Sequence, residues 1–320
     1  MNHAGGGATA TSSLRYVGVS VATLWASPSA PRKIDRAALG NPVDMRAWTR
    51  VLNTTARLGL VGRVETQALF GEPVRILAQR GSWTRIAVVD QPTPRDRQGY
   101  PGWVPSRQLS ASTSFGRLLT GRIAVVTRPT TWLHGELGPL ELSFGTRLPV
   151  VGVSGGNVIV ATPPGPTARL PSSDVGMYRS AGAISLPSGP ELVATARMFL
   201  GVRYLWGGAS AFGLDCSGLM NLIYRARGLV IPRDADPQAL AGRLVTQRAL
   251  QPGDLVFFAT EPPSRAITHV AMGVGDGRIL ESPNSAGAVH IIPLAARGDE
   301  RVTARRYLPP EKTSRAAERR

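Results

Sequence analysis

The sequence contains a single cysteine, Cys216, and no uninterrupted apolar run long enough to span a membrane. One cysteine cannot form a disulfide within the chain, so the fold does not need an oxidising compartment. The missing apolar run argues against a transmembrane helix. Residues 16–26 have the length of a signal-peptide core, but their valines alternate with small or polar residues, as in a half-buried strand. We expect a cytoplasmic protein, with secretion or association with a cell wall as the alternative.

Acidic residues are few relative to basic ones, 21 against 37, and the formal charge is +16. Such a charge is common in nucleic-acid-binding proteins. Here only Lys33 and Lys312 are lysines, the other basic residues are arginines spread along the whole chain, and no zinc finger, helix-turn-helix or RNP-type motif accompanies them. We therefore expect no nucleic-acid partner. Residues 301–320, rich in arginine, are expected to form a solvated, mobile tail.

With 320 residues, the chain is longer than one hydrophobic core usually allows, which predicts two or three domains. A stretch rich in Ser, Gly and Pro at 185–190 separates strand-like patterns from a part that also has helical patterns. The expected units are a disordered N-terminus (1–14), an all-β unit with a helical insertion (15–112), a second all-β unit (115–182), an α+β domain (188–309) and a basic tail (310–320).

Both all-β units are predicted from short strand patterns separated by turn residues. In the first unit, strands at 71–77 and 82–89 are joined by a turn at Gly81, and a helix is expected over 43–58. In the second unit, strands are expected at 122–126 and 147–151.

The α+β domain is expected to carry Cys216 in the first turn of a helix. Leucine, isoleucine and alanine recur at 219, 222, 223 and 226 with helical spacing, Gly228 suits the end of the helix, and Asp215 is a candidate N-cap. The N-terminal end of a helix favours a thiolate, which is the nucleophilic form of cysteine. A cysteine in the apolar core is the alternative, but Cys216 precedes the apolar positions.

Of the four histidines, His269 is the best candidate for a base. His3 lies in the expected disordered start and His134 in a loop-like stretch. The Gly-Asp-Gly sequence at 275–277 stands between two apolar runs and predicts a hairpin that begins at His269.

The second strand of this hairpin should supply a group that orients the histidine. A turn centred on Gly275 would place Glu281 opposite His269, whereas other turns favour Ser282 or Asn284. His290, on a later strand, is a rival.

These segments resemble the NlpC/P60 family of cysteine peptidases. The resemblance covers residues 192–308 and rests on YLWGGASAFGLDCSGLMNLIYRARGLVIPRDAD, LQPGDLVFFA and ITHVAMGVGDGRILES, which occur in this order. It implies a papain-like fold that cleaves murein peptides, with Cys216 as nucleophile, His269 as base and Tyr204 at the oxyanion site. No metal or organic cofactor is implied.

One position departs from the family pattern. The third catalytic residue of the family is usually a histidine, and this position falls on Glu281. A carboxylate can also orient and stabilise an imidazolium, so we expect a functional triad of Cys216, His269 and Glu281. The alternatives are His290 as the orienting group and Glu281 as an ordinary surface residue.

The first β unit is similar to bacterial SH3 domains through TQALFGEPVRIL, GSWTRIAV and GYPGWVPSRQL, and the second is similar to the same fold. The predicted fold is thus two SH3-like barrels followed by an α+β papain-like domain. This combination resembles γ-D-glutamyl-L-diamino-acid endopeptidases of murein-peptide recycling, which act on peptides with a free N-terminal L-alanine.

The resemblance to these endopeptidases implies contacts to the substrate amine from Asp215, Glu72 and Tyr100, assisted by Ser217. The alternatives are an N-cap for Asp215, a solvated turn residue for Glu72 and a packing aromatic for Tyr100. A serine expected after Arg233 is replaced by Ala235.

The sequence therefore predicts an endopeptidase for the γ-D-glutamyl–diamino acid bond. The alternatives are a secreted wall hydrolase anchored by its SH3-like units, a non-catalytic protein that binds wall peptides, and an acyl- or amine-transferring papain-like enzyme. The sequence leaves open which diamino acid follows D-glutamate and the oligomeric state.

Overall fold

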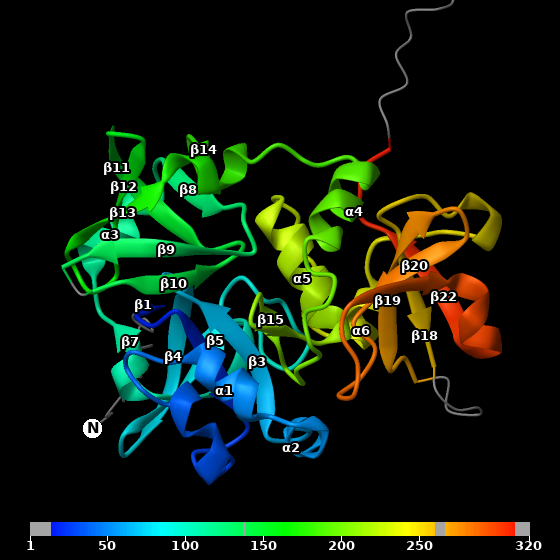
Figure 1. The fold of residues 1–320 in the computed structure, drawn as a ribbon, viewed down its shortest axis with the longest axis horizontal. Coiled ribbons are helices and arrows are strands. Elements are labelled where there is room, and N and C mark those ends of the chain that lie inside the picture. Colours follow the sequence, from blue (N-terminus) through cyan, green and yellow to red (C-terminus); the bar gives the residue numbers. More distant parts are fainter. Residues whose placement is uncertain (1–13, 137, 260–265, 311–320) are drawn as a thin grey trace, which may run out of the picture.

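The computed structural model describes residues 14–136, 138–259 and 266–310. The expected disordered start, except for Leu14, and nearly all of the basic tail lie outside these residues. In the described part of the chain, no helix is both long and apolar enough to cross a membrane. Figure 1 shows two β units, coloured blue to cyan and green, beside a third unit that contains helices and a sheet, coloured yellow to red.

The first β unit has one antiparallel sheet, with the strands in the order β3-β2-β6-β5-β4-β1-β7. Its strands are β1 (Leu14–Val17), β2 (Val21–Trp25), β3 (Val64–Leu69), β4 (Pro73–Arg80), β5 (Trp83–Val88), β6 (Tyr100–Pro105) and β7 (Leu109–Ser110). The predicted turn at Gly81 joins β4 and β5, and the glycine has a positive φ of 55°. Residues 16–26, expected to form a half-buried strand, contain the end of β1 and all of β2. Every residue of β2 is buried, whereas β1 is buried only at its end.

The helical insertion lies between β2 and β3 and differs from the prediction. A single helix over 43–58 was expected, but the structure has η1 (Lys33–Ala38), α1 (Met45–Val51) and α2 (Thr54–Leu58). The break occurs because Asn53 caps a new helix and accepts a hydrogen bond from the Ala56 amide at 2.9 Å. The short helix η2 (Ser106–Gln108) follows β6.

The second β unit repeats this architecture, with the strand order β10-β9-β13-β12-β11-β8-β14. It consists of α3 (Thr113–Leu118), β8 (Ile123–Val126), β9 (Thr130–Gly135), β10 (Leu140–Ser143), β11 (Arg147–Ser154), β12 (Asn157–Ala161), β13 (Thr167–Pro171), η3 (Ser172–Asp174), β14 (Val175–Tyr178) and η4 (Ala181–Ala183). His134, expected in a loop, lies on β9. As in the first unit, the sheet is open rather than a closed barrel.

The third unit packs helices against a six-stranded sheet in the order β17-β22-β18-β19-β20-β21, with a separate pair β15-β16. Its elements are α4 (Gly189–Arg197), β15 (Ala209–Ser210), β16 (Gly213–Leu214), α5 (Cys216–Ala226), α6 (Ala235–Leu240), β17 (Arg243–Leu244), η5 (Gln247–Ala249), β18 (Leu255–Phe258), β19 (His269–Gly275), β20 (Arg278–Glu281), β21 (His290–Pro293), η6 (Leu294–Glu300) and β22 (Arg301–Arg306).

The start of the arginine-rich end is not the mobile tail that was expected. Residues 301–306 form β22, which pairs with both β17 and β18. Arg306 donates hydrogen bonds of 2.6 Å to both carboxylate oxygens of Asp254, which is 1% exposed. Arg305 and Arg306 are half-buried and hydrogen-bonded, whereas a sequence shows only that arginines are frequent there, which is typical of a charged tail.

The first β unit and the third unit share one hydrophobic core. Trp25 and Trp48 of the first unit belong to the same buried cluster as Leu205 and Leu219 of the third. The side chain of Gln67 on β3 also reaches across this boundary, where its Oε1 accepts hydrogen bonds from the Ala209 amide and the Ser210 hydroxyl. The third unit is therefore held against β3 by apolar packing and by buried hydrogen bonds.

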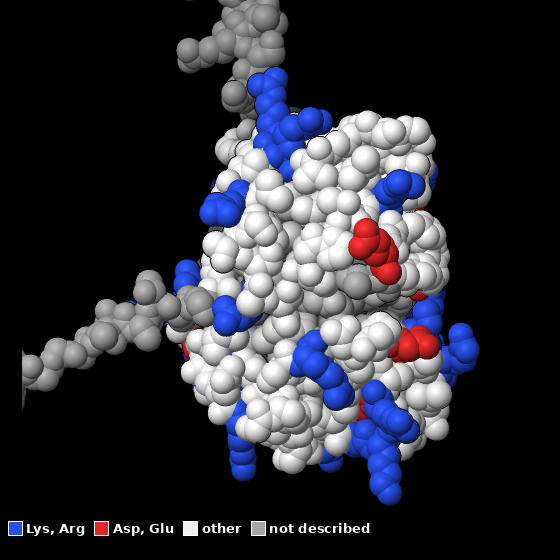
Figure 2. All heavy atoms as spheres, turned by 90° about the vertical axis from the view of Figure 1, so that its left-hand side faces the viewer, with Lys and Arg blue, Asp and Glu red and all other residues white. Residues whose placement is uncertain are grey.

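Basic side chains do not gather in one patch on the face shown in Figure 2. There they stand apart from one another among neutral surface, with a few acidic side chains between them. A nucleic-acid groove requires a continuous basic surface, and this face offers none.

Candidate active site

The helix α5 places Cys216 at its N-terminal end, as predicted. Asp215 is the N-cap, and its Oδ1 accepts a hydrogen bond of 2.6 Å from the Gly218 amide. Every residue of α5 is buried, and Cys216 itself is 8% exposed. The amide groups and the dipole of this helix end favour a negatively charged sulfur.

His269 begins β19 and faces Cys216. The predicted hairpin forms, with Asp276 and Gly277 at positive φ in the turn between β19 and β20. Burial alone would lower the pKa of His269, but hydrogen bonds with the side chains of Cys216 and Glu281 outweigh it and raise the pKa to about 9. At neutral pH the imidazole is therefore protonated next to the sulfur.

Glu281 is the direct partner of His269. The Nε2 atom of His269 lies 2.7 Å from Oε2 of Glu281, a side chain that is 1% exposed. A carboxylate only accepts hydrogen bonds, so Nε2 carries a proton and Nδ1 is left for Cys216. Burial would raise the pKa of Glu281, but hydrogen bonds from His269 and His290 lower it to about 2.

The rival partners of His269 have other contacts. His290 lies 3.0 Å from the second oxygen of Glu281 and thus binds the carboxylate rather than His269. The hydroxyl of Ser282 donates to the carbonyl of Leu214 at 2.7 Å. The geometry favours Glu281 as the orienting group.

Tyr204 is 6% exposed and lies beside Cys216. Burial, and then the negative charge of Cys216 and Asp215, raises the pKa of the phenol, which is consequently a hydrogen-bond donor at neutral pH. The Trp-Gly-Gly turn after Tyr204 packs tightly on the first β unit, because a Cβ at Gly207 would come within 2.5 Å of Val64. This contact fixes the position of the segment that carries the tyrosine.

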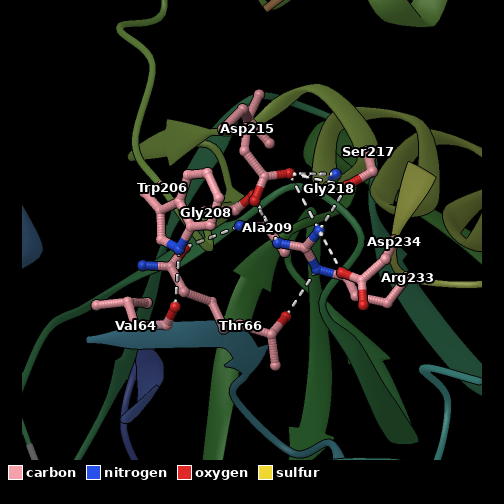
Figure 3. A network of polar contacts seen from close by, with 12 residues as sticks. Val64, Thr66, Trp206, Gly208, Ala209, Asp215, Ser217, Gly218, Arg233 and Asp234 are labelled. Atoms are coloured by element: carbon pink, nitrogen blue, oxygen red, sulfur yellow. Dashed lines mark hydrogen bonds and ion pairs between the residues drawn. The ribbon is translucent and has the colours of Figure 1, made fainter. Parts of the chain in front are cut away.

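Next to Cys216, Asp215 forms a buried ion pair with Arg233 (Figure 3). Two hydrogen bonds of 2.7 Å and 3.0 Å join the guanidinium to the two carboxylate oxygens. Arg233 also donates to the hydroxyls of Ser217, at 3.0 Å, and Thr66 of β3, at 2.8 Å. Together with the Gly218 amide and the Ser217 hydroxyl, which also donate to Oδ1, these contacts occupy about four acceptor positions of Asp215, as many as a carboxylate has.

Beyond Arg233, an acidic cluster joins the third unit to the first. The Tyr100 hydroxyl donates to the carboxylate of Asp234 at 2.9 Å. Arg95 donates to the same hydroxyl at 3.0 Å and to the carboxylate of Glu65 at 2.5 Å. Burial and the charge of Asp234 raise the pKa of Tyr100, and burial raises that of Asp234.

Comparison with known proteins decides the family. A model of the NlpC/P60 family matches residues 201–305, one of a bacterial dipeptidyl-peptidase SH3 domain matches 61–109, and one of a YKFC SH3b2 domain matches 126–178. A γ-D-glutamyl-L-lysine dipeptidyl-peptidase of Bacillus cereus is 40% identical over 92% of this chain and 91% of its own length. The chain belongs to the NlpC/P60 family.

Two further comparisons agree with this assignment. A γ-D-glutamyl-L-lysine dipeptidyl-peptidase of Bacillus subtilis is 37% identical over 86% of this chain and 92% of its own. The crystal structure of an NlpC/P60 family protein from Bacillus cereus superposes with a TM-score of 0.90, at 41% identity, over 93% of this chain and all of that one. The chain is thus an NlpC/P60 cysteine peptidase with two N-terminal SH3-like units, which confirms the predicted class of fold and enzyme.

The structure does not bring Glu72 to this site. Glu72 is buried against Arg225, with which it forms an ion pair. Arg225 lies nine residues after Cys216 on α5, about 13 Å along the helix axis. The expectation that Glu72 contacts the substrate is therefore wrong in its placement, and the glutamate that is linked to Tyr100, through Arg95, is Glu65. Glu65 lies near the start of β3, and Glu72 lies after its end.

Three other residues of the NlpC/P60 site had no role in the sequence analysis. Arg233 and Asp234 directly follow Pro232 in a segment that carries the family resemblance, and Arg95 lies in the loop before β6. A buried arginine near the acidic N-cap of a catalytic helix was a signal for Arg233, because a buried carboxylate needs a cation. Arg95 gave no such signal, since arginines are spread throughout the chain.

The described residues hold no group of three or more His, Cys, Asp or Glu side chains placed to bind a metal ion.

Proposed function

We propose that this protein hydrolyses the γ-D-glutamyl–diamino acid bond of murein peptides that carry a free N-terminal L-alanine. One observation carries the proposal. Tyr100 of the first unit donates a hydrogen bond to Asp234 of the third, and Arg95 joins the same hydroxyl to Glu65. Arg233, which precedes Asp234, holds the residues on both sides of Cys216. An acidic recognition cluster is therefore tied to the reaction centre.

The chemistry of this cluster suits an ammonium group. A buried ammonium has three donors and needs acceptors with negative charge. Asp234 and Glu65 supply the carboxylate acceptors, and the oxygen of Tyr100 lies between Asp234 and Arg95. The relatives from Bacillus cereus and Bacillus subtilis are matched over more than nine tenths of their own lengths and are named γ-D-glutamyl-L-lysine dipeptidyl-peptidases. These names support the same bond here.

In the proposed reaction, the sulfur of Cys216 attacks the γ-carbonyl carbon of D-glutamate and forms a C–S bond. The phenol of Tyr204 and backbone amides at Cys216 stabilise the oxyanion. As the carbonyl C–N bond breaks, His269 gives its proton to the leaving amine. A water molecule then attacks the thioester, His269 takes its proton, and the C–S bond breaks to release L-Ala-D-Glu.

The first SH3-like unit is assigned to substrate selection. It supplies Tyr100 and Glu65, and we propose that it closes the amine end of the cleft so that peptides still attached to glycan do not fit. Such soluble peptides are met inside the cell, and cytoplasmic residence is part of the proposal, to be tested by cell fractionation.

The test uses L-Ala-γ-D-Glu-meso-diaminopimelate and its lysine counterpart, each with a free and with an acetylated N-terminus. Products are identified by mass, and Cys216→Ala serves as the inactive control. The expected result is release of L-Ala-D-Glu from free peptides only. Equal cleavage of acetylated peptides would instead indicate a wall hydrolase, and binding without turnover would indicate a peptide-binding protein.

A further inference from the structure

The carboxylate of Glu281 has more hydrogen-bonding partners than a catalytic triad requires. His269 reaches Oε2 at 2.7 Å and His290 reaches Oε1 at 3.0 Å. Arg297 donates to Oε2 twice, from Nη2 at 2.6 Å and from Nε at 3.1 Å. Three of these four contacts fall on Oε2 and one on Oε1, so the oxygen that faces His269 is the more heavily hydrogen-bonded of the two.

Arg297 is held so that it serves the carboxylate. It lies on η6, which directly follows β21, and its side chain is 22% exposed. Its Cζ atom lies 5.6 Å from the centre of the Phe258 ring, an arrangement typical of a cation–π contact. Its Nη2 is also 3.2 Å from Nε2 of His269. Because both nitrogens carry protons, the two groups meet at Oε2 rather than bind each other.

A lone carboxylate in this place would have two disadvantages. It would have mainly the imidazolium of His269 to offset its charge in a buried site, and its oxygens would be free to rotate away from His269. Two hydrogen bonds from the planar guanidinium of Arg297 remove both disadvantages, because they fix the orientation of the carboxylate and neutralise part of its charge.

We propose that Arg297 is a positioning residue: its guanidinium holds Glu281 against His269 and shares its charge, which allows a carboxylate to act as the orienting group of this peptidase. The inference depends on the proposed function only in the turnover assay, because that assay uses the proposed substrate. The low pKa of Glu281 and the raised pKa of His269 agree with a carboxylate that stays charged between two cations.

Among the described residues, the titratable and charged groups that contact His269 or its partner Glu281 come from four elements. They are Cys216 of α5, Glu281 of β20, His290 of β21 and Arg297 of η6. Of these, only Arg297 is a permanent cation. Its removal leaves the charge of Glu281 to His269, which stabilises the imidazolium and moves its loss of a proton to higher pH.

The test compares Arg297→Gln, which keeps hydrogen-bond donors without charge, with Arg297→Lys, which keeps the charge without the planar fork. Turnover of the free tripeptide is measured from pH 6 to pH 10.5, and Arg278→Gln on the exposed start of β20 is the matched control. In Arg297→Gln we expect kcat to fall about tenfold or more and KM to change less than twofold. The basic limb of the pH profile, where activity is lost at high pH, should move up by about one pH unit. Arg297→Lys should restore the basic limb but only part of kcat.

A second readout needs no substrate. Cys216 is the only cysteine of the chain, so alkylation by iodoacetamide reports on it alone. In Arg297→Gln the acidic midpoint of the alkylation rate should fall, because a more stable imidazolium supports the thiolate at lower pH. This result would support the role of Arg297 even if the tripeptide were not cleaved.

Two outcomes would overturn the inference. One is an Arg297→Gln protein with wild-type pH profiles in both readouts. The other is an equal loss of kcat in the Gln and Lys variants with an unmoved basic limb, which would assign Arg297 to the scaffold alone. Circular dichroism of each variant separates these results from unfolding.

Discussion

The guanidinium of Arg233 and the carboxylate of Asp215 form a two-point ion pair directly beside the nucleophile, with Nη2 2.7 Å from Oδ2 and Nη1 3.0 Å from Oδ1. Arg233 is 1% exposed, so the pair is shielded from water. The same guanidinium binds Thr66 on β3 and thereby links the catalytic helix to the first SH3-like unit. The N-cap of that helix thus depends on a residue eighteen positions later in the chain.

Removal of this arginine should be strongly destabilising. Arg233→Ala leaves Asp215 buried without a cation, and we expect the free energy of unfolding to fall by about 3–5 kcal/mol. Urea unfolding followed by tryptophan fluorescence measures the loss. Arg97→Ala, at an exposed site in the loop before β6, is the control and should change stability by less than about 0.5 kcal/mol. A similarly small effect of Arg233→Ala would show that Asp215 does not need its partner.

The two glutamates near the ends of β3 should behave differently. Glu65→Gln removes a charged acceptor from the proposed amine site and should raise KM for the free tripeptide about tenfold. Glu72→Gln leaves Arg225 buried without its partner and should cost roughly 3 kcal/mol of stability with KM unchanged. Steady-state kinetics and urea unfolding of both variants test the distinction, and the reverse pattern would return Glu72 to the substrate site.

Arg95 occupies acceptors that the proposed substrate amine needs. Its guanidinium binds Glu65 and the Tyr100 hydroxyl and lies over the Tyr100 ring, with Cζ 5.2 Å from the ring centre. The side chain is 44% exposed, so this contact is worth only about 1 kcal/mol. Arg95→Ala should therefore lower KM for the free tripeptide about three- to tenfold, with Arg97→Ala as the control. A higher KM would mean that Arg95 itself contacts the substrate.

The phenol of Tyr204 should contribute to the chemical step rather than to binding. Tyr204→Phe keeps the ring and removes the donor, so kcat should fall about a hundredfold while KM stays within a factor of two. Stopped assays with the free tripeptide give both constants. An unchanged kcat would leave oxyanion stabilisation to backbone amides.

The pKa of His269 predicts a pH-dependent contribution to stability. Its folded value of about 9 lies above the ordinary 6.5, so this histidine stabilises the native state fully below pH 6.5, and the contribution is lost as the pH rises through 9. The difference in unfolding free energy between wild type and His269→Ala should shrink by on the order of 1–3 kcal/mol between pH 6 and pH 10. His134→Ala, on the exposed side of β9, is the control for loss of a histidine far from the site. A constant difference for His269 would contradict the ion pair with Glu281.

Local patterns in the sequence predicted the elements that carry the reactive groups. The apolar spacing after Cys216 marked α5, and Gly-Asp-Gly marked the hairpin of β19 and β20, because both signals arise within a dozen residues. The choice between Glu281 and His290 needed the register of three strands. In the structure Glu281 contacts His269, and His290 contacts only the other oxygen of the same carboxylate.

Contacts between distant segments escaped prediction. The pairing of Tyr100 with Asp234 spans 134 positions, and that of Arg233 with Thr66 spans 167. Such pairs leave no periodicity, and each residue alone is typical of a solvated turn. The helical insertion was misjudged for a local reason, because the capping side chain of Asn53 interrupts an otherwise continuous apolar pattern.

The insertion also reaches the reaction centre. Arg57 of α2 is 2% exposed and donates a hydrogen bond of 2.7 Å to the carbonyl of Tyr204. The first SH3-like unit and the catalytic unit also share an apolar core. The first unit therefore cannot be replaced by another SH3 domain without affecting the catalytic unit. Transplanting another SH3 module in front of the peptidase would disturb turnover as well as selectivity. A substitution at this junction that alters selectivity must therefore also leave the support of Tyr204 by Arg57 intact if turnover is to be kept.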